Sequence, residues 1–167
     1  MRVERLGEHH EFGGFSCGVK DLDDWLHTHA LDNQRRNLSR TFVLLDDANH
    51  VVGYYSLTMG GVRKEALPGQ YGRGLPGYDI GMVLLARFAI AVGHQGQGLG
   101  RDLLIEAIER AADAGTQVAA RFIAVDPIDE NARSFYAKFA FRQVEGDVGN
   151  RMYIRIDDAL AALGGLN

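Results

Sequence analysis

The segment whose residues most clearly suit ligand binding is Gln95–Arg101, which reads Gln-Gly-Gln-Gly-Leu-Gly-Arg. Glycines let a backbone turn tightly and approach a ligand without obstruction by a Cβ atom. An apolar run precedes this segment and an amphipathic pattern follows it, so it is expected to join a buried strand to a helix. The first amides of a helix have no internal partner, and the helix dipole is positive at that end. The amides from Gly96 to Arg101 therefore predict an anion cradle that suits a pyrophosphate.

Two common phosphate-binding loops do not fit these residues. A Walker A loop needs Gly-Lys-Ser/Thr after its second glycine, whereas Leu99-Gly100 follows Gly98 here. A dinucleotide fingerprint needs Gly-x-Gly-x-x-Gly, and Gly96, Gly98 and Gly100 have a different period. A purely structural alternative, in which the glycines only make a tight turn between strand and helix, stays open.

A second candidate is Tyr136, on a segment where Ala132, Phe135, Tyr136 and Phe139 recur at helical spacing. Asp129 stands where an N-cap would begin this short helix. A phenol has a reference pKa of about 10, so it is protonated at neutral pH and can donate a proton. The alternative is a core tyrosine that packs beside Phe135.

Both segments resemble signatures of the GNAT superfamily of N-acetyltransferases. Gln95, Gly98 and Gly100 match its Gln/Arg-x-x-Gly-x-Gly/Ala pattern, and residues 135–141 resemble its Phe-Tyr-x-x-x-Gly-Phe pattern with Ala140 in the glycine position. The resemblance implies acetyl-CoA as co-substrate, no metal, and Tyr136 as the catalytic general acid for the departing thiolate. The residues that it implies for coenzyme binding are Phe88, Ala89, Ile90, Gln95, Gly96, Gln97, Gly98, Leu99, Gly100, Arg101 and Phe135. Asp129 replaces an asparagine that contacts the pantetheine arm in many members, and we expect it to act as an N-cap instead.

The N-terminal half is similar to a narrower group, the TacT-like toxins. The resemblance rests on Phe15–Leu26, Val52–Leu57 and Leu84–Ile90, which follow the order of that group's motifs. It implies acetylation of the α-amino group of aminoacyl-tRNA, a ribbon-helix-helix antitoxin as partner, and a homodimer. Two alternatives stay open: a GNAT enzyme acting on a small amine or a protein N-terminus, and a non-catalytic module that binds coenzyme A.

Six basic residues are candidates for contacts with tRNA phosphates. They are Arg35, Arg36 and Arg40 in a stretch without acidic residues, and Arg63, Lys64 and Arg73 in the glycine-rich stretch Gly60–Gly81. Contacts of this kind would make binding depend on salt. An ordinary solvated surface is the alternative, because the formal net charge is −4.

The elements that must position these residues are expected in a clear order. A helix is predicted over Asp21–Asn33, then a hairpin of strands Thr41–Leu45 and Val51–Met59, a long connection Gly60–Gly81, and a strand Val83–Val92. A helix should open at His94–Gly100 and end at Gly115, followed by strand Val118–Val125, a short helix after Asp129, strands Phe141–Glu145 and Arg151–Ile156, and a helix Asp157–Leu163. This order indicates an α/β fold with a mixed sheet. The resemblance makes it a GNAT fold, a twisted and largely antiparallel sheet flanked by helices, in one domain over residues 1–167.

Composition narrows the remaining possibilities. The chain has 167 residues, 46% hydrophobic and 24% charged, which is typical of a single globular domain. One cysteine, Cys17, excludes an internal disulfide, and a packed small residue is favoured over a nucleophile. We find no secretory signal and no apolar run of membrane-spanning length, so a cytoplasmic protein without a membrane partner is expected. His9, His10, His27 and His29 lack partners at metal-ligand spacing and are expected to be surface or helix histidines.

Overall fold

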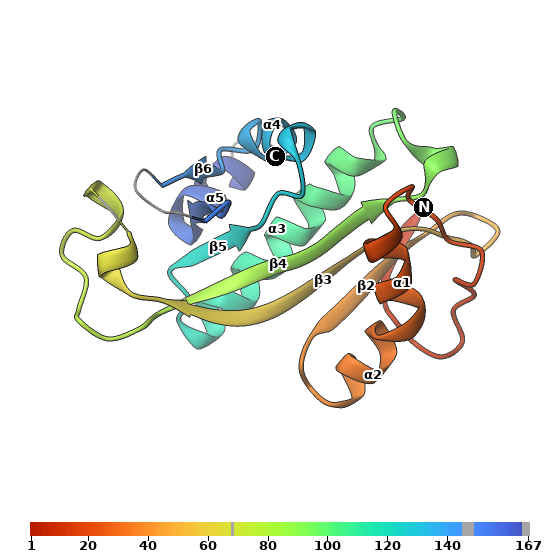
Figure 1. Ribbon diagram of the computed structural model, residues 1–167, viewed down its shortest axis with the longest axis horizontal. Helices are drawn as coiled ribbons and strands as arrows, with labels where there is room; N and C mark the ends of the chain where they lie inside the picture. Colours follow the sequence, from red (N-terminus) through yellow and green to blue (C-terminus); the bar gives the residue numbers. More distant parts are fainter. Residues whose placement is uncertain (68, 145–148, 165–167) are drawn as a thin grey trace. The chain divides into compact units, whose positions relative to one another are not determined.

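The computed structural model describes residues 1–67, 69–144 and 149–164. Its strands are β1 (Arg2–Arg5), β2 (Arg40–Leu45), β3 (Val51–Val62), β4 (Ile80–Ile90), β5 (Phe122–Val125), β6 (Arg142–Gln143) and β7 (Met152–Arg155). Its helices are α1 (Lys20–Thr28), α2 (Ala30–Arg35), α3 (Leu99–Val118), α4 (Glu130–Ala137) and α5 (Ile156–Gly164), with short 3-10 turns η1 (Lys64–Ala66), η2 (Gly69–Tyr71) and η3 (Val92–His94). Figure 1 shows these elements along the chain. No helix in the described part of the chain is both long and apolar enough to cross a membrane.

The strands form one mixed sheet in the order β1-β2-β3-β4-β5-β7-β6. Antiparallel pairing joins β1 to β2, β2 to β3, β5 to β7 and β6 to β7, whereas β4 and β5 run parallel. The expected α/β class with a mixed, largely antiparallel sheet is therefore confirmed. By its contacts the chain divides into two compact units, Met1–Thr58 with Ala86–Ala107 (unit 1) and Met59–Leu85 with Ile108–Asn167 (unit 2). A single domain over residues 1–167 stays a prediction.

Unit 1 is built on the β2–β3 hairpin, and helices α1 and α2 lie beside this hairpin (Figure 1). Leu22 and Leu26, one helical turn apart on α1, are buried in its core beside Phe15 and Tyr54. The Tyr54 hydroxyl donates to the carbonyl of Leu22 at 2.7 Å, so this buried polar group is satisfied. Burial of the apolar face of α1 fixes the helix against the sheet.

The single helix expected over Asp21–Asn33 is wrong, because the chain forms two helices that meet at His29. The backbone of His29 is distorted within the right-handed helical region, with φ −119° and ψ −27°, and its N–H still donates to the Trp25 carbonyl. Leu26 and Ala30, which lie four residues apart on either side of His29, are both buried.

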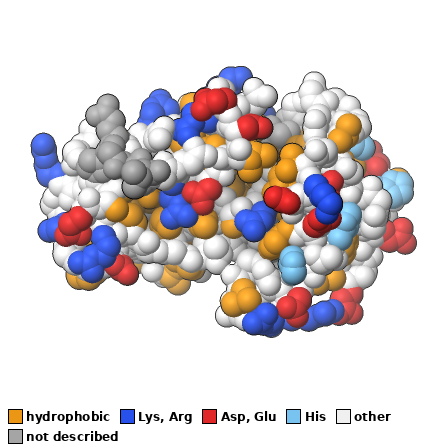
Figure 2. Space-filling model, in the orientation of Figure 1, with side chains coloured by type: hydrophobic (Ala, Val, Ile, Leu, Met, Phe, Trp, Pro, Cys, Tyr) orange, Lys and Arg blue, Asp and Glu red, His pale blue; other side chains and the backbone are white. Residues whose placement is uncertain are grey.

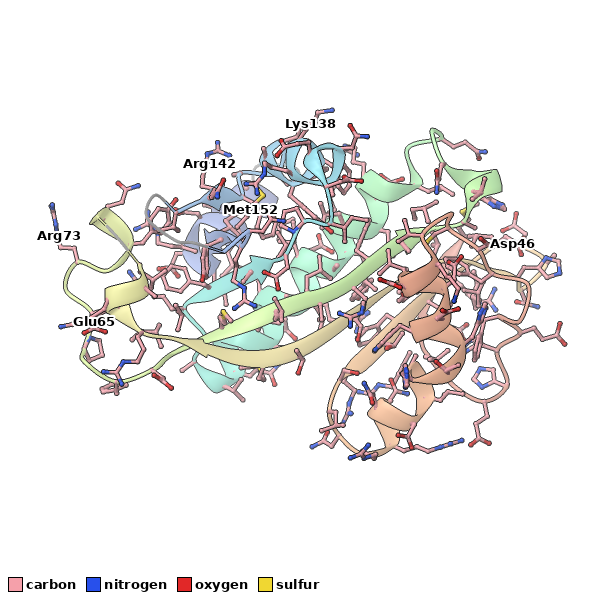
Figure 3. The ribbon with its side chains drawn as sticks, in the orientation of Figure 1. Asp46, Glu65, Arg73, Lys138, Arg142 and Met152 are labelled. Carbon is pink, nitrogen blue, oxygen red and sulfur yellow. The ribbon has the colours of Figure 1, made fainter. Side chains whose placement is uncertain are left out.

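Unit 2 contains β5 and β7, whose side chains share a core with Val62, Leu67 and Ile80. The stretch Gly60–Gly81 is only partly a loop, because β3 continues to Val62 and β4 begins at Ile80. Between them Leu67 is 2% exposed, so it ties the connection to the core. Figure 3 shows Glu65 and Arg73 at the outer part of this connection, away from the strands.

The prediction that Gly115 ends the long helix is wrong, as is a strand beginning at Val118. Helix α3 continues to Val118, and Ala119 adopts the left-handed conformation (φ 62°) that follows a helix end. Ala120 N–H then donates to the Gly115 carbonyl at 2.7 Å, a Schellman motif in which Gly115 lies inside the last turn. A Cβ at Gly115 would overlap Cδ1 of Ile156, so a larger residue at this position would force the Ile156 side chain to move.

The remaining predicted elements agree with the structure to within a few residues. The short helix after Asp129 is α4, the last helix is α5, and the two closing strands shorten to β6 and β7. The predicted strand end at Glu145 lies outside the described residues.

Candidate functional site

The glycine-rich segment joins β4 to α3 in unit 1, as its sequence predicts. Gly96 and Gly98 adopt positive φ angles of 74° and 84°, a region that favours glycine. The first described bond of α3 runs from Asp102 N–H to the Gly98 carbonyl at 3.3 Å. The amides of Leu99, Gly100 and Arg101 therefore lie in the first turn, ahead of the intrahelical ladder and at the positive end of the dipole. This is the geometry of an anion-binding helix start.

The side chains of the loop are engaged mainly with the loop itself. Gln97 Nε2 donates to the Gly93 carbonyl at 3.1 Å, and Gln95 Nε2 donates to the carbonyls of Ile90 and Cys17 at 2.9 and 3.0 Å. The guanidinium of Arg101 lies 3.3 Å from Asp102. Gln95 and Gln97 thus hold the shape of the loop, while the backbone is left to meet a ligand.

The last residues of β4 extend past the end of β5. Residues Met82–Leu85 of β4 pair with β5, and this pairing stops at Val125, where β5 ends. The amide of Ala91 donates to Val52 of β3 at 2.8 Å, so the alternation of a strand points the backbone groups of Phe88 and Ile90 toward the opposite edge. The backbone of Ala89, by contrast, points toward β3, and the residue is 5% exposed. Of the three expected coenzyme residues on β4, Phe88 and Ile90 thus have backbone groups that point toward this edge.

Tyr136 lies on α4 in unit 2, together with Phe135. It is 8% exposed, and its ring contacts Phe141 edge-on with ring centroids 5.9 Å apart and Phe135 at 5.5 Å. Burial raises the pKa of the Tyr136 phenol above its ordinary value, so the group stays protonated at neutral pH. The side chain is therefore a core residue whose phenol keeps its proton at neutral pH.

The two departures from the GNAT pattern have clear local roles. Asp129 caps α4 by accepting from Ala132 N–H at 2.8 Å, as expected. Ala140 adopts a left-handed conformation, with φ 68°. The family's glycine would relieve this strain, and the alanine keeps the turn that brings Phe141 beside Tyr136.

The six basic residues divide by their partners. Arg35 and Arg36 are each paired with a carboxylate, of Glu8 and Asp32 respectively, and Arg63 lies 3.6 Å from Glu65. Arg40 binds the Asn37 side chain and the carbonyls of Gln34 and Ser39. For Lys64 and Arg73 no ion pair exists among the described residues, and Figure 3 shows Arg73 pointing away from the chain. Basic and acidic side chains alternate on the face that Figure 2 shows, without a continuous basic patch.

Among the expectations for the cysteine and the histidines, one is wrong. Cys17 is buried, and burial followed by its contact with Asp23 raises the pKa of the thiol to about 11, so it is the packed residue that was expected. His10 is not a surface histidine, because it is 7% exposed and its Nδ1 accepts from Gly7 N–H at 2.9 Å. The neutral ring then carries its proton on Nε2, which lies 3.1 Å from Glu4.

That tautomer bears on a possible metal site. Glu4, His9 and His10 bring three potential ligand atoms within 4.8 Å of one another. A metal on Nε2 of His10 would require the proton on Nδ1, where it would face the Gly7 N–H. The geometry is therefore that of a hydrogen-bonded structural histidine.

Sequence patterns did not reveal two features of unit 1. Arg87 lies over the Trp25 ring, 5.2 Å from its centroid, and donates to the Ala86 carbonyl at 2.8 Å. Asp23 accepts hydrogen bonds from Ser16 and Cys17, at the base of the glycine-rich loop. The contact of Arg87 joins residues far apart in the chain, and the bonds of Asp23 span six and seven residues, a spacing to which no sequence rule points.

Comparison with known proteins gives a consistent result. The acetyltransferase (GNAT) family model matches residues 8–141. A tRNA-acetylating toxin of Mycobacterium tuberculosis is 36% identical over 96% of this chain and 95% of its own length. Among solved structures, AtaT complexed with acetyl-methionyl-tRNAfMet is 26% identical, with a TM-score of 0.87 over 96% of this chain and 98% of that one. AtaTR bound with AcCoA is also 26% identical, with a TM-score of 0.84 over 96% of each chain. The chain belongs to the GNAT family of acetyltransferases.

Proposed function

We propose that this protein is an acetyl-CoA-dependent N-acetyltransferase that acetylates the α-amino group of aminoacyl-tRNA and so blocks translation. The observation that carries the proposal is the similarity to a tRNA-acetylating toxin along 96% of the chain. The structure adds a glycine loop and helix start of the kind that binds a pyrophosphate. Charged tRNA is found in the cytoplasm, where we expect the protein to act, with a small ribbon-helix-helix antitoxin as its partner.

Coenzyme binding is assigned to unit 1. The amides of Leu99, Gly100 and Arg101 would hold the pyrophosphate, with Gly96 and Gly98 allowing the close approach of the backbone. The backbone of Phe88 and Ile90 would pair with the pantetheine arm along the edge beyond β5. The Ile90 carbonyl already accepts from Gln95, so the Ile90 N–H is the group that we assign to the thioester oxygen.

The chemistry is direct transfer from thioester to amine. The neutral amine attacks the thioester carbonyl, the C–S bond breaks, and Tyr136 donates a proton to the departing thiolate. The new amide loses a proton to solvent, and the Tyr136 phenolate takes one back from solvent, which restores the phenol. A reference α-amine has a pKa of about 7.7–8.0, so a useful fraction is neutral without a dedicated general base. Much of the rate is expected from positioning the amine beside the carbonyl.

The test is acetyl transfer from labelled acetyl-CoA to a pool of charged tRNAs. Uncharged tRNA, free amino acids, polyamines and peptide N-termini serve as alternative acceptors, and Tyr136→Phe serves as the variant without the phenol. Label on the aminoacyl group, with turnover lost by about 10²–10⁴-fold in the variant, is the expected result.

The other outcomes distinguish the rival functions. Label on free amines or peptide N-termini alone would keep the acetyltransferase and reject the tRNA acceptor. Coenzyme binding without transfer to any acceptor would indicate a non-catalytic module. Full turnover by Tyr136→Phe would remove the phenol from the mechanism.

A further inference from the structure

A single peptide unit in unit 1 joins helix α1 to the glycine-rich loop. On the α1 side, the N–H of Cys17 donates to Asp23 Oδ1 at 2.8 Å, and the Ser16 hydroxyl donates to Asp23 Oδ2 at the same distance. Asp23 lies in the first turn of α1, where the helix dipole favours a negative charge. Both carboxylate oxygens of Asp23 are therefore used to hold the segment before the helix.

The other side of the same peptide unit meets the loop. The N–H of Val92, the first residue of η3, donates to the Ser16 carbonyl at 2.9 Å. Gln95 Nε2 donates to the next carbonyl, of Cys17, at 3.0 Å. The Ser16–Cys17 peptide thus receives a hydrogen bond on its oxygen and gives one to a carboxylate through its nitrogen. Polarisation of the peptide by the carboxylate strengthens the bond from Val92.

Local packing holds this peptide in place. Phe15 and Cys17 are buried, and Gly18 turns the chain with a φ of 87° beside the Val92 side chain. Burial raises the pKa of Asp23, but the hydrogen bonds from the Cys17 amide, the Cys17 thiol and the Ser16 hydroxyl outweigh it and hold the pKa below its ordinary value. Asp23 is therefore ionised at neutral pH.

Packing gives the loop itself little support. A Cβ atom added at Gly93, Gly96 or Gly98 would find no described heavy atom within 4 Å. The loop residues Gln95–Gly98 are exposed. Since packing contributes little, the orientation of the turn depends on hydrogen bonds. Those of Val92 and Gln95 join it to the Ser16–Cys17 segment, in addition to the bonds within the loop and the bond from Ala91 to β3.

We propose that Asp23 is a positioning residue for the coenzyme loop, acting through the Ser16–Cys17 peptide. It does not touch the coenzyme; it fixes the segment against which the loop is held. The inference rests on the proposed function, because the loop is taken to bind the coenzyme pyrophosphate. It gives the Phe-Ser-Cys-Gly segment of the N-terminal motif a role in coenzyme affinity.

The decisive variant is Asp23→Asn, which keeps the size of the side chain and removes its charge. With the full chain, calorimetry measures the dissociation constant of coenzyme A, and steady-state kinetics separate kcat from the KM of each substrate. We expect the dissociation constant and the KM for acetyl-CoA to rise about tenfold, because a charge-assisted hydrogen bond is weakened. At saturating acetyl-CoA, kcat and the KM for aminoacyl-tRNA should stay within about twofold, since a displaced loop affects coenzyme binding alone.

Asp24→Asn is the matched control. Asp24 is the next residue on α1, is exposed, and pairs with Lys20 rather than with the Ser16–Cys17 segment. The same change of charge and side chain there should leave the affinity for coenzyme A as it is in the parent protein. Ser16→Ala, which removes one bond to Asp23, should weaken coenzyme A binding about threefold and provides the test if Asp23→Asn does not fold.

Unchanged coenzyme A affinity in Asp23→Asn and Ser16→Ala would overturn the proposal. So would an equal rise of both KM values, or a fall of kcat alone, because these results indicate general damage to the site. Failure of the parent protein to bind coenzyme A would overturn the proposed function itself. Coenzyme A binding by the parent protein with no transfer to charged tRNA would reject only the acceptor.

Discussion

Tyr136 is a buried phenol, and its burial sets the expected dependence of turnover on pH. Burial raises the pKa of Tyr136, so the group stays protonated while a reference α-amine titrates at about 7.7–8.0. We therefore expect kcat/KM for aminoacyl-tRNA to rise as the amine loses its proton and then to stay level to about pH 10. Rapid-quench assays between about pH 6 and pH 9.5 keep hydrolysis of the aminoacyl ester small. A falling limb in this range would show that an acid of lower pKa is required.

The control for this prediction is the Tyr136→Phe variant, measured over the same pH range. The phenol does not titrate there, so its removal should lower the whole profile by about 10²–10⁴-fold and leave its shape unchanged. A profile of changed shape would assign the proton donor to a different group.

Helix α3 shows how one glycine serves the packing of an element. Ala at position 115 would gain about 1 kcal/mol of helix propensity, but its Cβ would overlap the Cδ1 atom of Ile156, which is 3% exposed. Overpacking a buried site costs about 1–3 kcal/mol. We expect Gly115→Ala to lower the free energy of unfolding by about 1 kcal/mol, measured by urea denaturation.

A second variant isolates the cause. Ile156→Val removes the Cδ1 atom and alone costs about 0.5–1.5 kcal/mol. In the Gly115→Ala/Ile156→Val pair the overlap is gone, so the double variant should be more stable than the sum of the two single changes predicts. Strict additivity would show that Gly115 is not selected by this contact.

The elements that the sequence predicts well are those with strong periodicity. Helix α3, the glycine loop before it and the N-cap of α4 follow from short-range patterns, and all three are confirmed. The end of α3 was not predictable in this way, because the left-handed residue after it is Ala119 rather than a glycine. The hydrogen bond from the Gln95 side chain to the Cys17 carbonyl joins residues 78 positions apart, a separation that no local pattern spans.

At the scale of the whole molecule, charge gives no general attraction for tRNA. The formal net charge is −4, and acidic and basic side chains alternate on the surface in Figure 2. Any contact with phosphates must come from individual cations that carboxylates do not already neutralise. Arg35 and Arg36 form ion pairs, whereas Lys64 and Arg73 form none among the described residues.

The paired and unpaired cations should therefore differ in their effect on tRNA affinity. Each phosphate contact contributes about 0.7–0.9 to the slope of log affinity against log salt concentration. We expect Lys64→Gln together with Arg73→Gln to reduce the slope by about 1.5 and to weaken tRNA binding, measured by filter binding from about 50 to 200 mM salt. Arg155→Gln is the control, since Arg155 lies 2.9 Å from Asp158 and is already neutralised. If Arg155→Gln changes the slope as much as the double variant, binding follows total charge, and the connection between β3 and β4 is not a tRNA contact.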